Sequence, residues 1–167
     1  MEQEKPKNTF EFIESLYLPG YMTLTSADYD KKGGTFEFNI KEPPVVREGL
    51  VDYFTPRGLH ICITQAGVAL VENMVKEGKL EYLNLQNFRN IILQGRVKIT
   101  ELYQKWRREV KVKEPIQGRI DITRTRLGKV PILKMDFKFE NKSVHGNLTS
   151  IIVPNPVPQT NQDILRI

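Results

Sequence analysis

Three polar side chains with catalytic potential lie within two helical turns of each other in an otherwise apolar stretch. His60 carries an imidazole, whose unperturbed pKa of about 6.5 suits a general base near neutral pH, although a histidine simply hydrogen-bonded at a helix start is equally open. Thr64 lies one turn further on and could orient that imidazole or hold a water, but a buried threonine more often bonds its own helix backbone. Gln65 carries an amide that needs several partners when buried, so both a site role and a structural role remain open.

The residues just before this group, and one in an earlier hairpin, add further candidates. Tyr53 and Tyr29 could each donate a hydrogen bond from a hydroxyl, although most tyrosines at such places pack with only the tip in water. Arg57 could bind a phosphate or be a solvated loop cation. Gly58 and Leu59 open the helix, where unpaired backbone amides lie at the positive end of the helix dipole.

These candidates must be positioned by a helix that we expect from Gly58 to Gly78. Its residues before Glu72 are almost all apolar, whereas a helix on a surface would show a single apolar stripe. We therefore expect this helix to be buried nearly all round, with Gly78 as its C-cap.

The remaining segments surround this helix with strands. A short helix is expected from Phe10 to Tyr17, and a hairpin turns at Gly33 and Gly34. The segment from Leu80 to Ile92 is ambiguous between a helix and irregular structure. After Gly95 the apolar residues alternate with polar ones, which predicts several antiparallel strands. The expected organisation is a helical lead-in (residues 1–21), one domain (22–153) and a polar tail (154–167).

One apolar helix among half-polar strands predicts an α+β fold, in which a strongly curved antiparallel sheet wraps around the helix. This arrangement resembles the hotdog fold. Within that superfamily, the segment from Tyr53 to Gln65 is similar to the FcoT-type long-chain acyl-CoA thioesterases, where an aromatic loop precedes an Ile-Cys-x-x-Gln helix, matched here by Ile61, Cys62 and Gln65. The sequence departs from this pattern in having His60 where that family is expected to have Asn, and Tyr53 where many hotdog enzymes have His.

The resemblance implies hydrolysis of a fatty acyl-CoA or acyl carrier protein thioester, at a homodimer interface near the start of the central helix. Such a reaction needs a positioned water and donors for the developing oxyanion. From their positions and residue types, we take His60, Gln65, Tyr53 and Thr64 as the candidate catalytic residues, and Gly58, Leu59, Arg57 and Tyr29 as the candidate substrate-binding residues.

Two alternatives to hydrolysis remain open, and each is judged against the same observation: the helix carries no Asp or Glu before Glu72. A dehydratase acting on a 3-hydroxyacyl thioester would be expected to show a loop His and a helix acid, and Tyr53 and Gln65 fall near those places without supplying that pair. A hotdog protein that binds acyl groups without reacting them would need no helix carboxylate at all.

Composition limits the partners. The chain has 25 Lys and Arg against 20 Asp and Glu, a net charge of +5 that permits an anionic ligand without selecting one. The densest basic stretch, Lys105 to Lys113, could dock the phosphates of coenzyme A or an acidic carrier protein, or could simply guard an edge strand. Nucleic acid binding is not indicated, because zinc-ligand spacing and an aromatic RNA-binding signature are both missing. His145 alternates with apolar strand residues, as a surface histidine does.

The single Cys62 excludes a disulfide within one chain and a Cys-based metal site, and the sequence predicts no cofactor. The N-terminal residues lack the apolar core of a signal peptide, and we expect no apolar run to approach the ~20 residues that span a bilayer. We therefore expect no membrane partner and a cytoplasmic location.

Overall fold

The computed structural model describes residues 10–18, 21–40, 54–80, 83–110, 115–126 and 131–153. Three helices and six strands occur in these segments. In chain order they are α1 (Glu11–Leu16), β1 (Leu24–Tyr29), β2 (Gly33–Phe38), α2 (Pro56–Lys76), α3 (Leu85–Leu93), β3 (Val97–Trp106), β4 (Ile116–Arg126), β5 (Ile132–Phe139) and β6 (Val144–Ile152).

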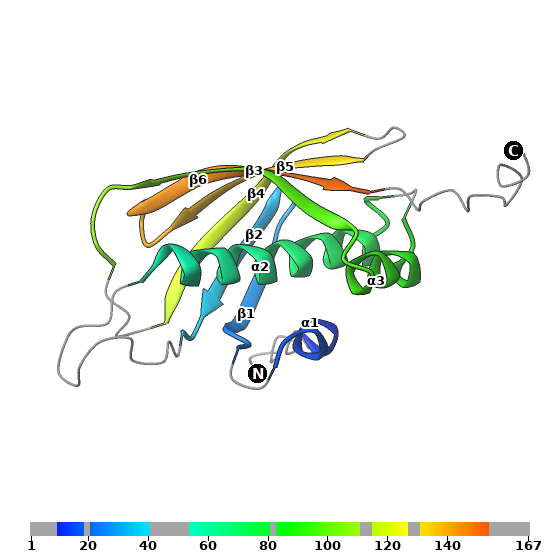
Figure 1. The fold of residues 1–167 in the computed structure, drawn as a ribbon, viewed down its shortest axis with the longest axis horizontal. Helices are drawn as coiled ribbons and strands as arrows, with labels where there is room; N and C mark the ends of the chain where they lie inside the picture. Colours follow the sequence, from blue (N-terminus) through cyan, green and yellow to red (C-terminus); the bar gives the residue numbers. More distant parts are fainter. Residues whose placement is uncertain are drawn as a thin grey trace, which may run out of the picture.

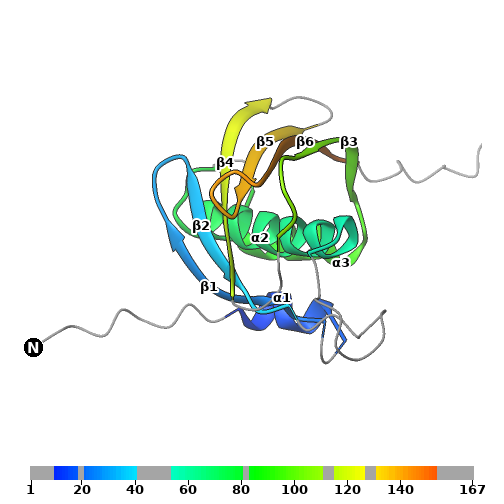
Figure 2. The same cartoon turned by 90° about the vertical axis from the view of Figure 1, so that its left-hand side faces the viewer.

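All six strands form one antiparallel sheet in the order β1-β2-β4-β5-β6-β3. The sheet curls over α2, so that β1 and β2 lie on one side of the helix and β3 on the other (Figure 2). The expected α+β fold, with a curved antiparallel sheet around one long helix, is therefore confirmed. β3 stands last in this order, beside β6, and therefore forms one edge of the sheet.

The inner face of the sheet is aromatic. Side chains alternate across a strand, so Phe36 and Phe38 of β2 face the same layer, as do Phe137 and Phe139 of β5. Each of these four rings is at most 1% exposed. Gly118 of β4 leaves room for Phe139, since a Cβ at this glycine would approach the ring to 2.5 Å.

The ends of α2 are defined by local signals. Thr55 is the N-cap, its hydroxyl accepting a hydrogen bond from the Gly58 amide at 3.1 Å, and Pro56 occupies the first turn, where its missing N–H costs nothing. At the other end Gly78 adopts φ +70°, and the Lys79 amide donates to the Met74 carbonyl at 2.9 Å, as in a Schellman motif. The prediction of Gly78 as the residue that ends the helix is confirmed.

The burial of α2 differs from the prediction. The helix lies beneath the sheet (Figure 1), but one row of its residues is only half-buried or exposed. We call this row the open stripe: His60, Ile61, Thr64, Gly67 and Val68. The apolar composition concealed the stripe, because three of its five members are Ile, Gly and Val. By length and composition α2 could also cross a membrane, contrary to the expectation from the sequence, but packing under the sheet already accounts for its apolar character.

The two short helices cover the C-terminal half of α2. Ile13 of α1 is fully buried, and the Phe12 ring meets the Phe88 ring of α3 edge-on at 6.4 Å between centroids. The ambiguous segment after Gly78 thus contains a helix, α3, whose N-cap Asn84 accepts from the Asn87 amide at 2.8 Å.

Candidate functional site

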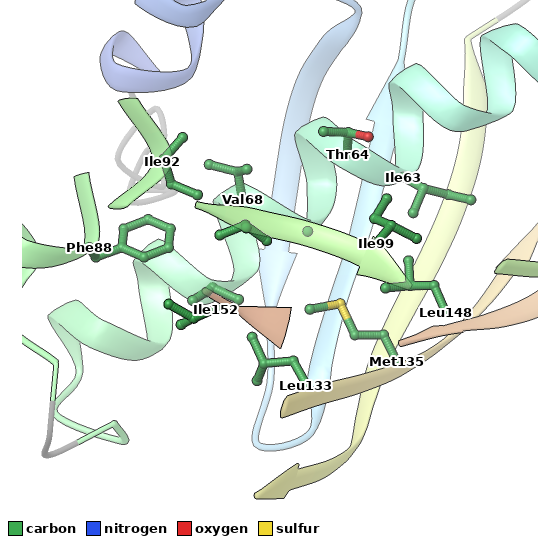
Figure 3. Close-up of a pocket in the computed structure, with 13 residues that line it drawn as sticks. Ile63, Thr64, Val68, Phe88, Ile92, Ile99, Leu133, Met135, Leu148 and Ile152 are labelled. Carbon is green, nitrogen blue, oxygen red and sulfur yellow. The ribbon is translucent and has the colours of Figure 1, made fainter. Parts of the chain in front are cut away.

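An apolar pocket lies between α2, α3 and the strands β3, β5 and β6. Its volume is about 80 Å³. Figure 3 shows side chains from all five elements around it, with the Thr64 hydroxyl as the one oxygen among the labelled side chains. The lining residues are Ile63, Thr64, Gly67, Val68, Val71, Phe88, Ile92, Val97, Ile99, Leu133, Met135, Leu148 and Ile152. Such a lining suits an aliphatic chain and offers little to a polar ligand.

The pocket opens beside the stripe on α2. Thr64, Gly67 and Val68 belong both to the open stripe and to the pocket wall. On the opposite wall, Ile99 of the edge strand is 39% exposed. The cavity is therefore a groove along α2 rather than an enclosed void, and its helix wall leads toward the polar residues at the start of α2.

His60 and Thr64 are brought together on the open stripe, as their spacing predicted. The Thr64 hydroxyl donates to the His60 backbone carbonyl at 2.8 Å, which is the backbone bond that buried threonines commonly make. The His60 side chain is exposed and makes no hydrogen bond within the described residues. Its imidazole is thus exposed to solvent, one helical turn from Thr64 in the pocket wall.

Gln65 faces the other way, toward β1, and is fully buried. Its Oε1 accepts from the Thr23 hydroxyl at 2.8 Å and from the Thr23 and Leu24 amides at 3.0 Å each. Its Nε2 donates to the Tyr21 carbonyl at 2.8 Å. The amide therefore fastens the entry of β1 to α2, and the structure does not bring it together with His60 and Thr64.

The first amides of α2 are already used. The Gly58 amide donates to the Thr55 hydroxyl, and the Leu59 amide donates to the Thr55 carbonyl at 2.9 Å. Gly58 and Leu59 are both buried, so neither offers the free donor that the sequence suggested. Arg57 is exposed at the same end of the helix.

Tyr29 lies at the far end of α2. Its ring packs edge-on against Phe36 at 5.9 Å, and its pKa is raised by burial and, secondarily, by the negative charge of Glu72. Glu72 is twelve positions beyond His60, which is about 18 Å along a helix that rises 1.5 Å per residue. The structure therefore separates Tyr29 from His60. The prediction for Tyr53 falls outside the described residues.

Glu72, the first carboxylate of α2, is also occupied. It is 5% exposed, and its Oε1 accepts from Arg89 of α3 at 2.7 Å (Nη2) and 3.2 Å (Nε), with the Lys76 ammonium at 3.4 Å. The Arg89 guanidinium in turn lies 4.9 Å from the centre of the Phe12 ring. This carboxylate ties α3 and α1 to α2 and does not face the pocket.

Sequence reasoning missed two polar groups on the inner face of β3. Gln104 and Trp106 pair in register with Gly146 and Val144 of β6, and the Trp106 ring packs on Phe54 at 5.8 Å, just before α2. The Gln104 Oε1 and the Trp106 Nε1 are buried and have no hydrogen-bond partner among the described residues. The alternation around the exposed Tyr103 and Lys105 could have shown that these two side chains face inward.

The basic stretch leaves the sheet at the end of β3. Lys105 is exposed on the outer face, and the Arg108 Nε donates to the Ser143 hydroxyl in the β5–β6 turn at 2.6 Å. Residues 111–113 lie outside the described residues. His145, which pairs with Lys105 across β3 and β6, is half-buried on the same outer face, away from the pocket. Over the part of the chain that is described, no group of three or more His, Cys, Asp or Glu could hold a metal ion.

Comparison with solved structures agrees with this architecture. A candidate thioesterase from Shewanella oneidensis aligns with a TM-score of 0.54 at 10% identity, over 87% of this chain and 100% of that one. A homologue of HP0420 from Helicobacter felis aligns with a TM-score of 0.51 at 12% identity, over 92% of this chain and 93% of that one. At these identities the likeness shows the fold alone, and the fold is the hotdog fold. No protein-family model matches the sequence, and no curated protein matches it either.

Proposed function

We propose, with the hotdog fold as premise, that the protein hydrolyses acyl thioesters, with the acyl chain in the apolar pocket and the thioester beside the first turns of α2. The observation that carries this proposal is the continuity of the groove. Thr64 lines the apolar pocket, and His60 lies one helical turn nearer the start of α2 on the same open stripe. A ligand with an aliphatic tail and a reactive polar head fits this order of surfaces.

In the proposed reaction, His60 takes a proton from a water whose oxygen bonds to the thioester carbonyl carbon. The carbon–sulfur bond then breaks, and the thiol leaves with the proton that the imidazole carried. The developing oxyanion needs a donor. Because the Gly58 and Leu59 amides are bonded to Thr55, and the Thr64 hydroxyl donates to the His60 carbonyl, we assign that donor to the Tyr53 hydroxyl. Gln65 has a positioning role, holding β1 against the helix.

We further propose that a second copy of the chain covers the open stripe. Gly67 lies inside α2, where glycine costs about 1 kcal/mol relative to alanine, yet a Cβ there would meet only the Met135 Sδ at 3.9 Å within this chain. Close approach of another helix would account for a glycine at this position. On the edge strand, Leu102 is 38% exposed and faces the same open side. A homodimer would bury both.

The substrate class follows from the pocket and the local resemblance. The pocket wall, which is apolar apart from Thr64, and the FcoT-like residues Ile61, Cys62 and Gln65 favour a long-chain acyl group. Arg57 and the basic stretch from Lys105 favour an anionic thiol carrier, either coenzyme A or an acidic carrier protein.

The test is release of free thiol from acyl-CoA thioesters of increasing chain length. His60→Ala should lower kcat by at least about 10², because general base catalysis contributes 10²–10⁴-fold. The matched control is His145→Ala, which removes the other histidine of the chain, on the outer face. Equal activity of the wild type and His60→Ala would remove His60 from the mechanism.

One observation favours a second candidate, a hotdog protein that binds acyl groups without reacting them. The pocket wall carries no carboxylate, and Glu72 is committed to Arg89 and Lys76. In that case long-chain acyl-CoA would raise the melting temperature of the protein. No thiol would be released from acyl-CoA or from an acylated carrier protein.

A further inference from the structure

The starting observation is a set of three buried side-chain polar atoms with no partner among the described residues: His145 Nδ1 on the outer face of the sheet, and two atoms on its inner face, which form the pair of interest. Gln104 presents an acceptor, Oε1, and Trp106 presents a donor, the indole N–H. A buried polar group without a hydrogen bond costs about 1–3 kcal/mol, so a matched pair of them indicates a missing occupant.

The sheet itself cannot satisfy these atoms. Their cross-strand neighbours on β6 are Gly146 and Val144, neither of which has a polar side chain. A Cβ at Gly146 would lie 2.7 Å from the Phe137 ring, so an aromatic ring fills the space beside Gln104. The two side chains are two positions apart on one strand and so face the same layer.

The position of the pair matches the proposed groove. On the inner face of β3, Val97 and Ile99 line the apolar pocket, and Gln104 and Trp106 lie at the other end of the same strand. Trp106 meets Phe54, just before α2, whereas Ile99 and Thr64 share the pocket wall. His60 lies between Phe54 and Thr64 along the chain. A thioester beside His60 would therefore point its acyl chain toward the apolar pocket, beside Thr64, and its thiol arm toward Trp106, beside Phe54.

We propose that Gln104 and Trp106 bind an amide of the thiol arm of the substrate, an inference that rests on the proposed function. An amide N–H would donate to the Gln104 Oε1, and an amide carbonyl would accept from the Trp106 N–H. A thioester has no N–H and could satisfy only the tryptophan, whereas the amides of a pantetheine arm satisfy both. This arm is common to coenzyme A and to acyl carrier proteins, so the pair selects for the arm and not for either carrier.

Binding of S-decyl-pantetheine, a thioether that cannot be hydrolysed, tests the proposal directly. Isothermal titration calorimetry measures the affinity of the wild type and of every variant. Trp106 is the single tryptophan of the chain, so in the wild type and in Gln104→Leu its fluorescence should also change when the ligand binds. Gln104→Leu and Trp106→Phe should each weaken binding about 3- to 10-fold, the loss expected for one neutral hydrogen bond. Trp106→Phe keeps an aromatic ring against Phe54, so the fold is preserved.

The controls separate arm recognition from general damage. Decanoate has the alkyl chain without amides, and its binding should be unchanged in both variants. Gln117→Leu makes the same change as Gln104→Leu at an exposed position, and Tyr103→Phe removes the hydrogen-bond donor of an exposed aromatic side chain. Both should leave the binding of both ligands unaffected. Equal weakening of both ligands, or no change in either, would overturn the proposal and leave a trapped water as the partner of the pair.

The failure of this inference is distinguishable from failure of the proposed function. A protein that binds the thioether through Gln104 and Trp106 but releases no thiol retains the arm site and lacks the reaction. A protein that hydrolyses thioesters equally well in all variants has the reaction and lacks the arm site. Parallel titrations with S-decyl-CoA and an S-decylated carrier protein should show the same loss factor in the variants, and the tighter of the two identifies the source of the arm.

Discussion

The two sides of α2 treat their polar residues in opposite ways. On the side facing β1 and α3, which we call the clamped side, Gln65 and Glu72 are almost fully buried and are held by residues far away in the sequence. On the open stripe, the Thr64 hydroxyl bonds only its own helix, at the His60 carbonyl, and the His60 side chain makes no hydrogen bond among the described residues. Polar groups on the clamped side are committed to holding the fold, so chemistry is left to the open side.

The strongest test of this contrast is Gln65→Leu, which keeps the side chain's approximate size and removes its hydrogen bonds. The Thr23 and Leu24 amides and the Thr23 hydroxyl, all buried, would then lose the Gln65 oxygen as their acceptor, at about 1–3 kcal/mol each. We expect the free energy of unfolding in urea to fall by at least about 3 kcal/mol. His60→Ala, on the open stripe, should change it by less than about 0.5 kcal/mol. Similar losses in the two variants would erase the distinction between the sides.

A second change on the clamped side should have a smaller effect. Arg89→Leu leaves the Glu72 carboxylate buried with only the Lys76 ammonium nearby, and we expect a loss of about 2 kcal/mol. The figure is below that for a fully buried pair, because the Arg89 side chain is 36% exposed. Lys76→Ala is the matched control and should cost under about 0.5 kcal/mol, since that ammonium lies at the surface. Thermal unfolding monitored by circular dichroism measures the stability of both variants. Equal losses would show that Lys76 stabilises the Glu72 carboxylate as much as Arg89 does.

The sequence predicted where the helices and strands lie better than it predicted which residues they contact. Apolar length located α2, the change to a period of two located the strands, and Gly78 located the helix end. In contrast, the partners of Gln65 lie in the segment before β1, about forty positions earlier, and nothing local in the sequence indicates that contact. The same holds for β3, whose place at the sheet edge beside β6 depends on the path of the whole chain.

Residue type also misdirected the search for the site. A buried amide and a helix-start amide both look available for chemistry, but Gln65 is bonded to β1 and Gly58 to the Thr55 cap. Conversely, Trp106 was read as part of a basic stretch, because Lys105, Arg107 and Arg108 dominate its neighbourhood. Which donors and acceptors have partners, and which do not, can be seen only once the strands are paired in the structure.

Gly67→Ala sharpens the comparison from the open side. The added methyl group fits within one chain, with Met135 at ordinary contact distance, so the chain should gain about 0.5–1 kcal/mol from better helix propensity. If a second helix packs against the stripe, the same methyl group should weaken the dimer. Urea unfolding at low concentration and sedimentation at several concentrations separate the two effects. A stabler chain with an unchanged dimer would show that the partner does not approach α2 at this point.

The smallest effect is expected far from both sides, in the β1–β2 turn. Amides of Lys32 and Gly33, together with the Arg119 guanidinium, lower the pKa of Asp30 from 3.8 to about 2. Because the pKa is lower in the folded state, this carboxylate contributes stability above about pH 4 and loses it as the pH falls through 2. Asp30→Asn should therefore show a flatter dependence of the urea midpoint on pH between 4 and 2. Parallel curves for the two proteins would assign the acid sensitivity to other carboxylates.

The strand order has a consequence for how the chain reaches its native state. The hairpins β1–β2 and β5–β6 join neighbouring segments and can form early, on the microsecond scale typical of hairpins. Joining β2 to β4, however, closes a loop that contains α2, α3 and the edge strand β3. The entropy cost of closing this loop must be met before the contacts between β2 and β4 can stabilise the chain. We therefore expect the pairing of β2 with β4, in which Phe38 meets Ile116, to be the slowest step of folding.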